Sequence, residues 1–126
     1  MTGSDFEREI KTGLQSTGWF VIRSAGSKAV DLVAIDPENG HTLLLECKTF
    51  KEDTFRISKT KELREQHAEM CRLQSMFNGH ASVFYVLKKK RQNEIRFIHP
   101  SRLSKPYHWD REGNDKSVRR GMGCTN

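Results

Sequence analysis

A chain of 126 residues with 35% hydrophobic and 30% charged residues has room for one domain with a single core. No apolar run approaches the roughly 20 residues that cross a bilayer, so we expect no membrane segment. The first ten residues hold no apolar signal core, and the three cysteines show no CxxC spacing. We therefore expect a cytoplasmic protein with free thiols. The formal net charge of +6 favours a polyanionic partner such as nucleic acid.

The first half of the chain predicts one helix and three strands. Apolar residues recur every four positions within 5–17, which predicts a helix, and Ser4 with Glu7 has the form of an N-terminal capping box. Runs rich in β-branched and aromatic residues predict strands at 19–23, 29–36 and 42–50. The SAGSK segment separates the first two strands as a loop, and turn residues between 37 and 41 predict a hairpin between the last two.

The second half predicts one helix and two further strands. We expect a loop over 51–60, a helix over 61–78, and strands over 81–87 and 94–99 joined by a basic turn. Prolines interrupt the pattern after this point, so residues 1–100 are expected to form the domain and 101–126 a basic C-terminal tail. The order α-β-β-β-α-β-β predicts an α/β fold with one mixed five-stranded sheet flanked by helices.

A candidate site lies on the third predicted strand. Side chains alternate across a strand, so Glu46 and Lys48 project from one face while Cys47 points to the other. Counting inward from the hairpin brings Asp31, near the start of the preceding strand, close to Glu46. Two carboxylates and an ammonium group are therefore expected to converge at one end of the sheet.

Such a pair of carboxylates is costly unless a cation lies between them, because two like charges at contact distance repel. Mg²⁺ prefers oxygen ligands and retains several waters, so Asp31, Glu46 and the backbone carbonyl of Cys47 could hold it. Lys48 could then stabilise a phosphoryl transition state. The pattern predicts metal-dependent hydrolysis of a phosphodiester.

The same residues have a simpler interpretation. A D-x(n)-E-x-K spacing occurs by chance, as an acidic strand start followed by an exposed E-x-K face. The apolar run at 43–45 weighs against this, because it indicates a strand buried on both faces, where Glu and Lys are uncommon.

A longer pattern resembles a known family. The segment RSAGSKAVDL at 23–32 looks like the signature of the archaeal-type Holliday junction resolvases, within the restriction-endonuclease-like PD-(D/E)xK superfamily. Gly3, the Glu7-Arg8-Glu9 run, Gly18 and the Glu46-Cys47-Lys48 strand occur in the same order and at similar spacing. The similarity covers residues 3–50 well, is looser up to Pro100 and does not extend beyond it. Val30 stands where the superfamily pattern has Pro.

The resemblance implies a restriction-endonuclease-like fold and a homodimer that cuts four-way and other branched DNA with Mg²⁺, for which Mn²⁺ could substitute. It implies catalytic roles for Glu7, Asp31, Glu46 and Lys48, and metal binding by Asp31, Glu46, Glu7 and the Cys47 carbonyl. Contacts to DNA are implied for Arg8, Arg23, Ser24, Ser27 and Lys28.

Several of these residues have structural alternatives. Glu7 could serve only the capping box, Arg8 could be a solvated surface charge, and Arg23 could form a structural ion pair. Gly26 could only allow a tight turn. His67 and Cys71 have the i,i+4 spacing of zinc ligands but lack a second pair.

Two other functions remain open from the sequence. One is a different nuclease of the same superfamily that cuts duplex or flap DNA, and the other is a DNA-binding module without catalytic activity. For a dimer interface the sequence offers only aromatic residues of the second helix and fourth strand, such as Phe77 and Tyr85. A C2 dimer would match the two-fold symmetry of a junction, which needs two cuts.

Overall fold

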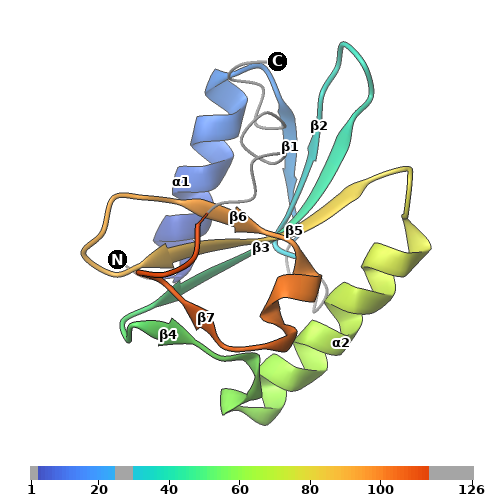
Figure 1. Ribbon diagram of the computed structural model, residues 1–126. Coiled ribbons are helices and arrows are strands. Elements are labelled where there is room, and N and C mark those ends of the chain that lie inside the picture. The colour runs from blue at the N-terminus through green and yellow to red at the C-terminus, as the bar shows by residue number, and fades with distance from the viewer. Residues whose placement is uncertain (1–2, 25–29, 114–126) are drawn as a thin grey trace.

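The computed structural model describes residues 3–24 and 30–113 as an α/β domain with two helices, drawn in Figure 1. The helices are α1 (Gly3–Ser16) and α2 (Lys61–Met76). The strands are β1 (Phe20–Arg23), β2 (Leu32–Ile35), β3 (Thr42–Phe50), β4 (Thr54–Phe55), β5 (Ser82–Lys89), β6 (Arg96–Ile98) and β7 (Tyr107–His108). Two short 3-10 helices, η1 (Ile57–Lys59) and η2 (Pro100–Ser104), complete the described elements. Neither α1 nor α2 combines the length and the apolar composition of a membrane span.

Five strands form one mixed sheet in the order β1-β2-β3-β5-β6. The β1-β2, β2-β3 and β5-β6 pairs are antiparallel, and β3 pairs with β5 in parallel through the α2 crossover. The predicted mixed five-stranded sheet is therefore confirmed. The segment predicted as a loop over 51–60 contains β4, which pairs with β7 in a second, two-stranded sheet that the sequence pattern did not predict.

The sheet is covered by helices on both faces, as Figure 1 shows. The apolar stripe of α1 packs against Leu43, Leu45 and Cys47 of β3 on one face. On the other face, Met70 and Leu73 of α2 lie in a cluster with Leu44 and the inward side chains of β5. The central strand β3 is buried on both faces, as its apolar run predicted.

Two local predictions were wrong. The α1 helix begins at Gly3, so Ser4 lies inside it and does not precede it as a cap, and the Glu7 carboxylate pairs with Arg23 instead. Tyr85 is fully buried, which excludes it from a dimer interface. Its phenol oxygen forms a hydrogen bond with His67, as expected for a buried polar group.

The described part of the C-terminal segment is a packed element of the domain, whereas the sequence pattern predicted a tail from residue 101. Leu103, Tyr107 and Trp109 are buried in the same cluster as α2. The buried guanidinium of Arg96 donates to the backbone oxygens of Trp109 and Glu112 at 2.6 and 2.8 Å, and it stacks on the Trp109 ring. The three apolar residues are separated by polar residues without a regular period, so the sequence pattern did not predict this packing. Residues 114–126 lie outside the described part.

Candidate active site

The position of Asp31 is fixed by hydrogen bonds at the start of β2. Its backbone N–H donates to the carbonyl of Leu45 at 2.9 Å, beside the Leu32–Leu45 pair of the β2-β3 ladder. Its side-chain Oδ2 accepts from the backbone N–H of Cys47 at 2.8 Å. The carboxylate therefore lies over the middle of β3, where counting from the hairpin had placed it.

Glu46 is a buried carboxylate with two polar partners. Its side chain is 4% exposed, and Oε2 lies 3.3 Å from the ammonium nitrogen of Lys48. The same oxygen accepts a hydrogen bond from the side-chain amide of Gln66 on α2. Burial, and after it the nearby charge of Asp31, raise the pKa of Glu46 to about 8, while Lys48 acts in the opposite direction. Without a cation, this carboxylate is therefore largely protonated at neutral pH.

Glu7 approaches the same cluster from α1. Its Oε2 lies 3.4 Å from a guanidinium nitrogen of Arg23. Burial is the main cause of the raised pKa of Glu7, the carboxylate of Asp31 adds to it, and Arg23 acts in the opposite direction. Three carboxylates from α1, β2 and β3 thus influence one another, and the structure brings together the four residues that the resemblance implied as catalytic.

The donor set fits a divalent cation that keeps several water ligands. Two of the three carboxylates are driven toward protonation by burial and by Asp31, which a metal ion would reverse. In a strand the N–H and C=O of one residue point to the same side, so the Cys47 carbonyl faces the side on which its N–H meets Asp31. Asp31, Glu46 and this carbonyl would supply the protein oxygens that Mg²⁺ requires.

The predicted role of Glu7 as a metal ligand stays a prediction. Within residues 3–24 and 30–113, no three His, Cys, Asp or Glu side chains are grouped so that they could hold a metal by themselves. Because Mg²⁺ is usually held by one or two carboxylates, this does not count against Asp31 and Glu46. The pairing of Glu7 with Arg23 suggests a supporting role for both residues, in line with the structural ion pair considered for Arg23.

The residues predicted to contact DNA are only partly placed by the structure. Arg8 is exposed on α1 and lies 3.5 Å from Asp5, the kind of surface pair that contributes little to stability. Ser24 donates its backbone N–H to the carbonyl of Asp31 at 2.9 Å, so it adjoins the site. Ser27 and Lys28, together with Gly26, lie outside the described residues.

Two site residues on α2 were missed by sequence reasoning. Gln66 reaches Glu46, and the adjacent His67 bonds through Nδ1 to the Tyr85 hydroxyl at 3.1 Å. Tyr85 is the direct register partner of Glu46 on β5. A polar residue on an amphipathic helix carries no signal of such a contact, which depends on the crossover that returns α2 over β3. The zinc alternative gains no support, since the described residues add no third His, Cys, Asp or Glu ligand to His67 and Cys71, which lie 3.6 Å apart.

Comparisons with known proteins identify the family of the chain. The model of a family described as archaeal Holliday junction resolvase (Hjc) matches residues 1–116. A crossover junction endodeoxyribonuclease Hjc from Methanocaldococcus jannaschii is 40% identical over 102 residues, which are 81% of this chain and 68% of the relative. The structure of Archaeoglobus fulgidus Hjc, a Holliday junction resolvase, is similar with a TM-score of 0.61 and 26% identity over 79% of this chain and 73% of that one. The resemblance and the restriction-endonuclease-like fold are confirmed, and the chain belongs to the archaeal Holliday junction resolvase family.

Proposed function

We propose that the protein is a metal-dependent endonuclease that resolves four-way DNA junctions. The observation that carries this proposal is the cluster of Asp31, Glu46 and Lys48 at the start of β2 and the middle of β3. Membership of the resolvase family supports the same substrate class. The free thiols of Cys47 and Cys71 suit a reducing compartment, and we place the protein in the cytoplasm.

Each residue of the cluster has a separate task in this mechanism. Asp31 and Glu46, with the Cys47 carbonyl, would hold Mg²⁺, and Mn²⁺ has the same preference for oxygen donors. The bound ion would supply charge neutralisation at the scissile phosphate. Lys48, held beside Glu46, places its ammonium where negative charge develops on the phosphoryl oxygens. Gln66 and Lys48 both contact Oε2 of Glu46, which fixes the orientation of that carboxylate.

We further propose that the protein acts as a homodimer through the open part of its sheet. Phe20 and Ile22 on β1 are 58% and 47% exposed, which is unusual for large apolar side chains. Ladder pairing sets Phe20 opposite Ile35 and Ile22 opposite Val33, so the four side chains form one apolar strip. A second copy is the occupant that the task requires, because two opposed strands of a symmetric junction must be cut by two sites.

The proposed interface can be tested with a charge placed in the strip. Ile22→Lys is expected to convert the dimer to a monomer, since a lysine cannot be buried there without a partner. Thr12→Lys, which adds the same charge to an exposed position of α1, is the control and should leave the dimer intact. Light scattering measures both, and a monomeric parent protein would contradict the proposal.

The proposed activity is tested with a panel of synthetic substrates. A four-way junction, a flap and a linear duplex of the same sequence are incubated with the protein, with and without Mg²⁺. We expect cleavage of the junction alone, with paired cuts, and only when Mg²⁺ is present. Preferred cleavage of the duplex or flap would favour another nuclease activity on this fold, and binding without cleavage would favour a non-catalytic module.

A further inference from the structure

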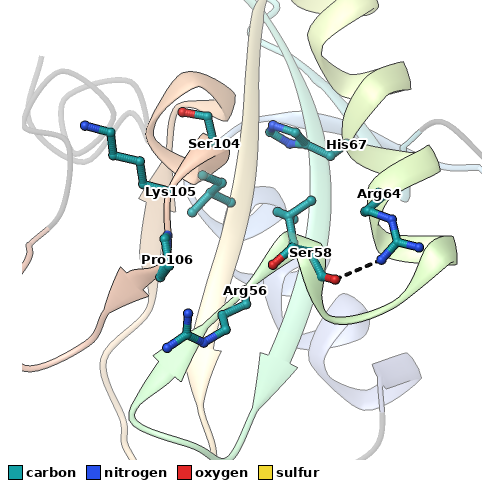
Figure 2. Close-up of a pocket in the computed structure, with 9 residues that line it drawn as sticks. Arg56, Ser58, Arg64, His67, Ser104, Lys105 and Pro106 are labelled. Atoms are coloured by element: carbon teal, nitrogen blue, oxygen red, sulfur yellow. Dashed lines mark hydrogen bonds between the residues drawn. The ribbon is translucent and has the colours of Figure 1, made fainter.

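A polar cavity near the active site is lined by three separate segments of the chain. Figure 2 shows Arg56 and Ser58 from the β4–η1 segment, Arg64 and His67 from α2, and Ser104, Lys105 and Pro106 from the connection between η2 and β7. The cavity has a volume of about 170 Å³, and Ile57 and Leu103 complete its lining. None of these residues belongs to the metal site.

The lining is strongly cationic and contains no carboxylate. Arg56, Arg64 and Lys105 take part in none of the ion pairs formed among residues 3–24 and 30–113. The cations of the active site differ, because Arg23 and Lys48 each lie within 3.4 Å of a glutamate oxygen. Three uncompensated charges around one hollow favour an anionic ligand.

The cationic groups are arranged around the cavity and do not meet at one point. The Arg64 guanidinium is held against η1 by a hydrogen bond of 2.9 Å to the carbonyl of Ser58, which Figure 2 marks. In the same view the Arg56 and Lys105 head groups lie apart from it and from each other. His67 serves as a wall, since its two ring nitrogens are already directed to Tyr85 and Cys71. This spread suits an extended anion better than a small chelated one.

Helix α2 connects this cavity to the active site. Gln66 holds the Glu46 carboxylate, and the next residue, His67, lines the cavity. The cavity is therefore within a short distance of the site, on the face of the sheet that α2 covers.

We propose that this cavity, which we call the arginine pocket (Arg56, Ser58, Arg64, Ser104 and Lys105), binds a backbone phosphate of the junction away from the point of cleavage. The inference rests on the proposed function and adds an interaction that holds the substrate in position. Arginine forks and serine hydroxyls are the usual donors to phosphate oxygens. Such an interaction carries no base information, as shape recognition of a junction requires.

The test is the salt dependence of junction binding in Ca²⁺, which replaces Mg²⁺ so that affinity is measured without turnover. The double variant Arg56→Gln/Lys105→Gln removes two charges and keeps an uncharged polar side chain at each position. Its Kd for a four-way junction should rise at least 10-fold, and the slope of log K against log salt should fall by about 0.9 for each phosphate that the variant no longer neutralises. The control Lys11→Gln/Arg111→Gln removes the same charge elsewhere, so it should retain most of the parent slope.

Two further measurements separate the sources of the anion. Titration calorimetry with inorganic phosphate at constant ionic strength should show no saturable binding, and light scattering should give the same oligomeric state for parent and double variant. Saturable phosphate binding that the double variant loses would overturn the backbone assignment in favour of a small-anion site. A change of oligomeric state would make the pocket an interface between copies and would equally overturn it.

Failure of this inference is distinguishable from failure of the proposed function. A parent protein that binds the junction, with a double variant of unchanged Kd and slope, would overturn the arginine pocket alone. A parent protein that binds no junction would overturn the proposed function and the pocket together. All four substituted side chains lie outside the buried core, so both double variants are expected to fold. Melting curves of the two variants check this.

Discussion

At the scale of single residues, the active site depends on a carboxylate that the fold keeps out of water. Glu46 is buried between β5 and α2, and burial of an ionised carboxylate is unfavourable unless partners offset it. Lys48 and Gln66 supply part of that compensation. The remaining imbalance, which raises the pKa of Glu46, is what a bound Mg²⁺ would remove. The site is therefore less stable without its metal than with it.

The role of Lys48 separates chemistry from binding. Lys48→Ala should lower the single-turnover cleavage rate by about 10²-fold or more, the scale of losing one preorganised stabilising group. Lys48→Arg should not restore the rate fully, because a planar guanidinium cannot occupy the position of a point charge beside Glu46. Lys51→Ala, an exposed lysine three residues along the chain, is the control and should cut like the parent. A normal rate for Lys48→Ala would refute this role.

The raised pKa of Glu46 predicts how stability depends on pH in the metal-free protein. Between the ordinary pKa of 4.5 and the folded value of about 8, the folded protein binds more protons than the unfolded chain. Its free energy of unfolding should therefore fall as pH rises through this window, by roughly 1.4 kcal/mol per unit from this group. Glu46→Gln should flatten the dependence and melt at a higher temperature than the parent at pH 8.

Thermal melts in EDTA and in Mg²⁺ measure this effect independently of activity. Mg²⁺ should raise the melting temperature of the parent and raise that of Glu46→Gln much less, because a ligand of the metal is lost. Glu38→Gln, at an exposed position of the β2-β3 turn, should behave like the parent in both solutions. Equal pH profiles for the parent and Glu46→Gln would show that the carboxylate is not perturbed by its surroundings.

At the scale of elements, the site is assembled where three segments meet. The β2-β3 ladder sets Asp31 against Cys47, α1 brings Glu7, and the crossover helix α2 lays Gln66 over Glu46. The first of these relations follows from hairpin register and could be predicted from the sequence. The placements of Glu7 and Gln66 depend on which helix covers which face of the sheet. The pattern of apolar and polar residues within each helix does not determine this arrangement.

The C-terminal segment is the element that the sequence misrepresents. Periodicity predicted α1, β3 and α2 because each has a regular apolar pattern of adequate length. The segment from Pro100 to Gly113 has no such pattern, yet it buries Leu103, Tyr107 and Trp109 around the guanidinium of Arg96. Packing of irregular backbone against a buried arginine is a tertiary effect, and an apolar count of the segment does not reveal it.

This packing predicts a large cost for losing one side chain. Trp109→Ala should lower the free energy of unfolding by about 3–5 kcal/mol, since it creates a cavity and removes the ring on which Arg96 stacks. Arg111→Ala, two residues away and exposed, should change it by less than about 0.5 kcal/mol. Urea denaturation provides both values. A loss below about 1 kcal/mol for Trp109→Ala would mean that this segment is not part of the core.

At the scale of the whole molecule, the net positive charge and the proposed two-fold symmetry both bear on how DNA is bound. A net charge of +6 per chain would give the proposed dimer an attraction to DNA that weakens with salt through counterion release. The apolar strip on β1 and β2 and the arginine pocket beside α2 assign different surfaces to the partner copy and to the substrate. In the proposed mechanism, both surfaces would bring a DNA strand to the metal site.

The most direct test of the proposed site is the single-turnover cleavage of a four-way junction in Mg²⁺ by Asp31→Asn, measured beside its binding of the same junction in Ca²⁺. We predict that cleavage is lost while affinity is equal to or greater than that of the parent, because a metal ligand is removed and a negative charge facing DNA disappears. Asp110→Asn, at an exposed position, should leave both properties unchanged. Cleavage by Asp31→Asn at the parent rate would contradict the proposed site.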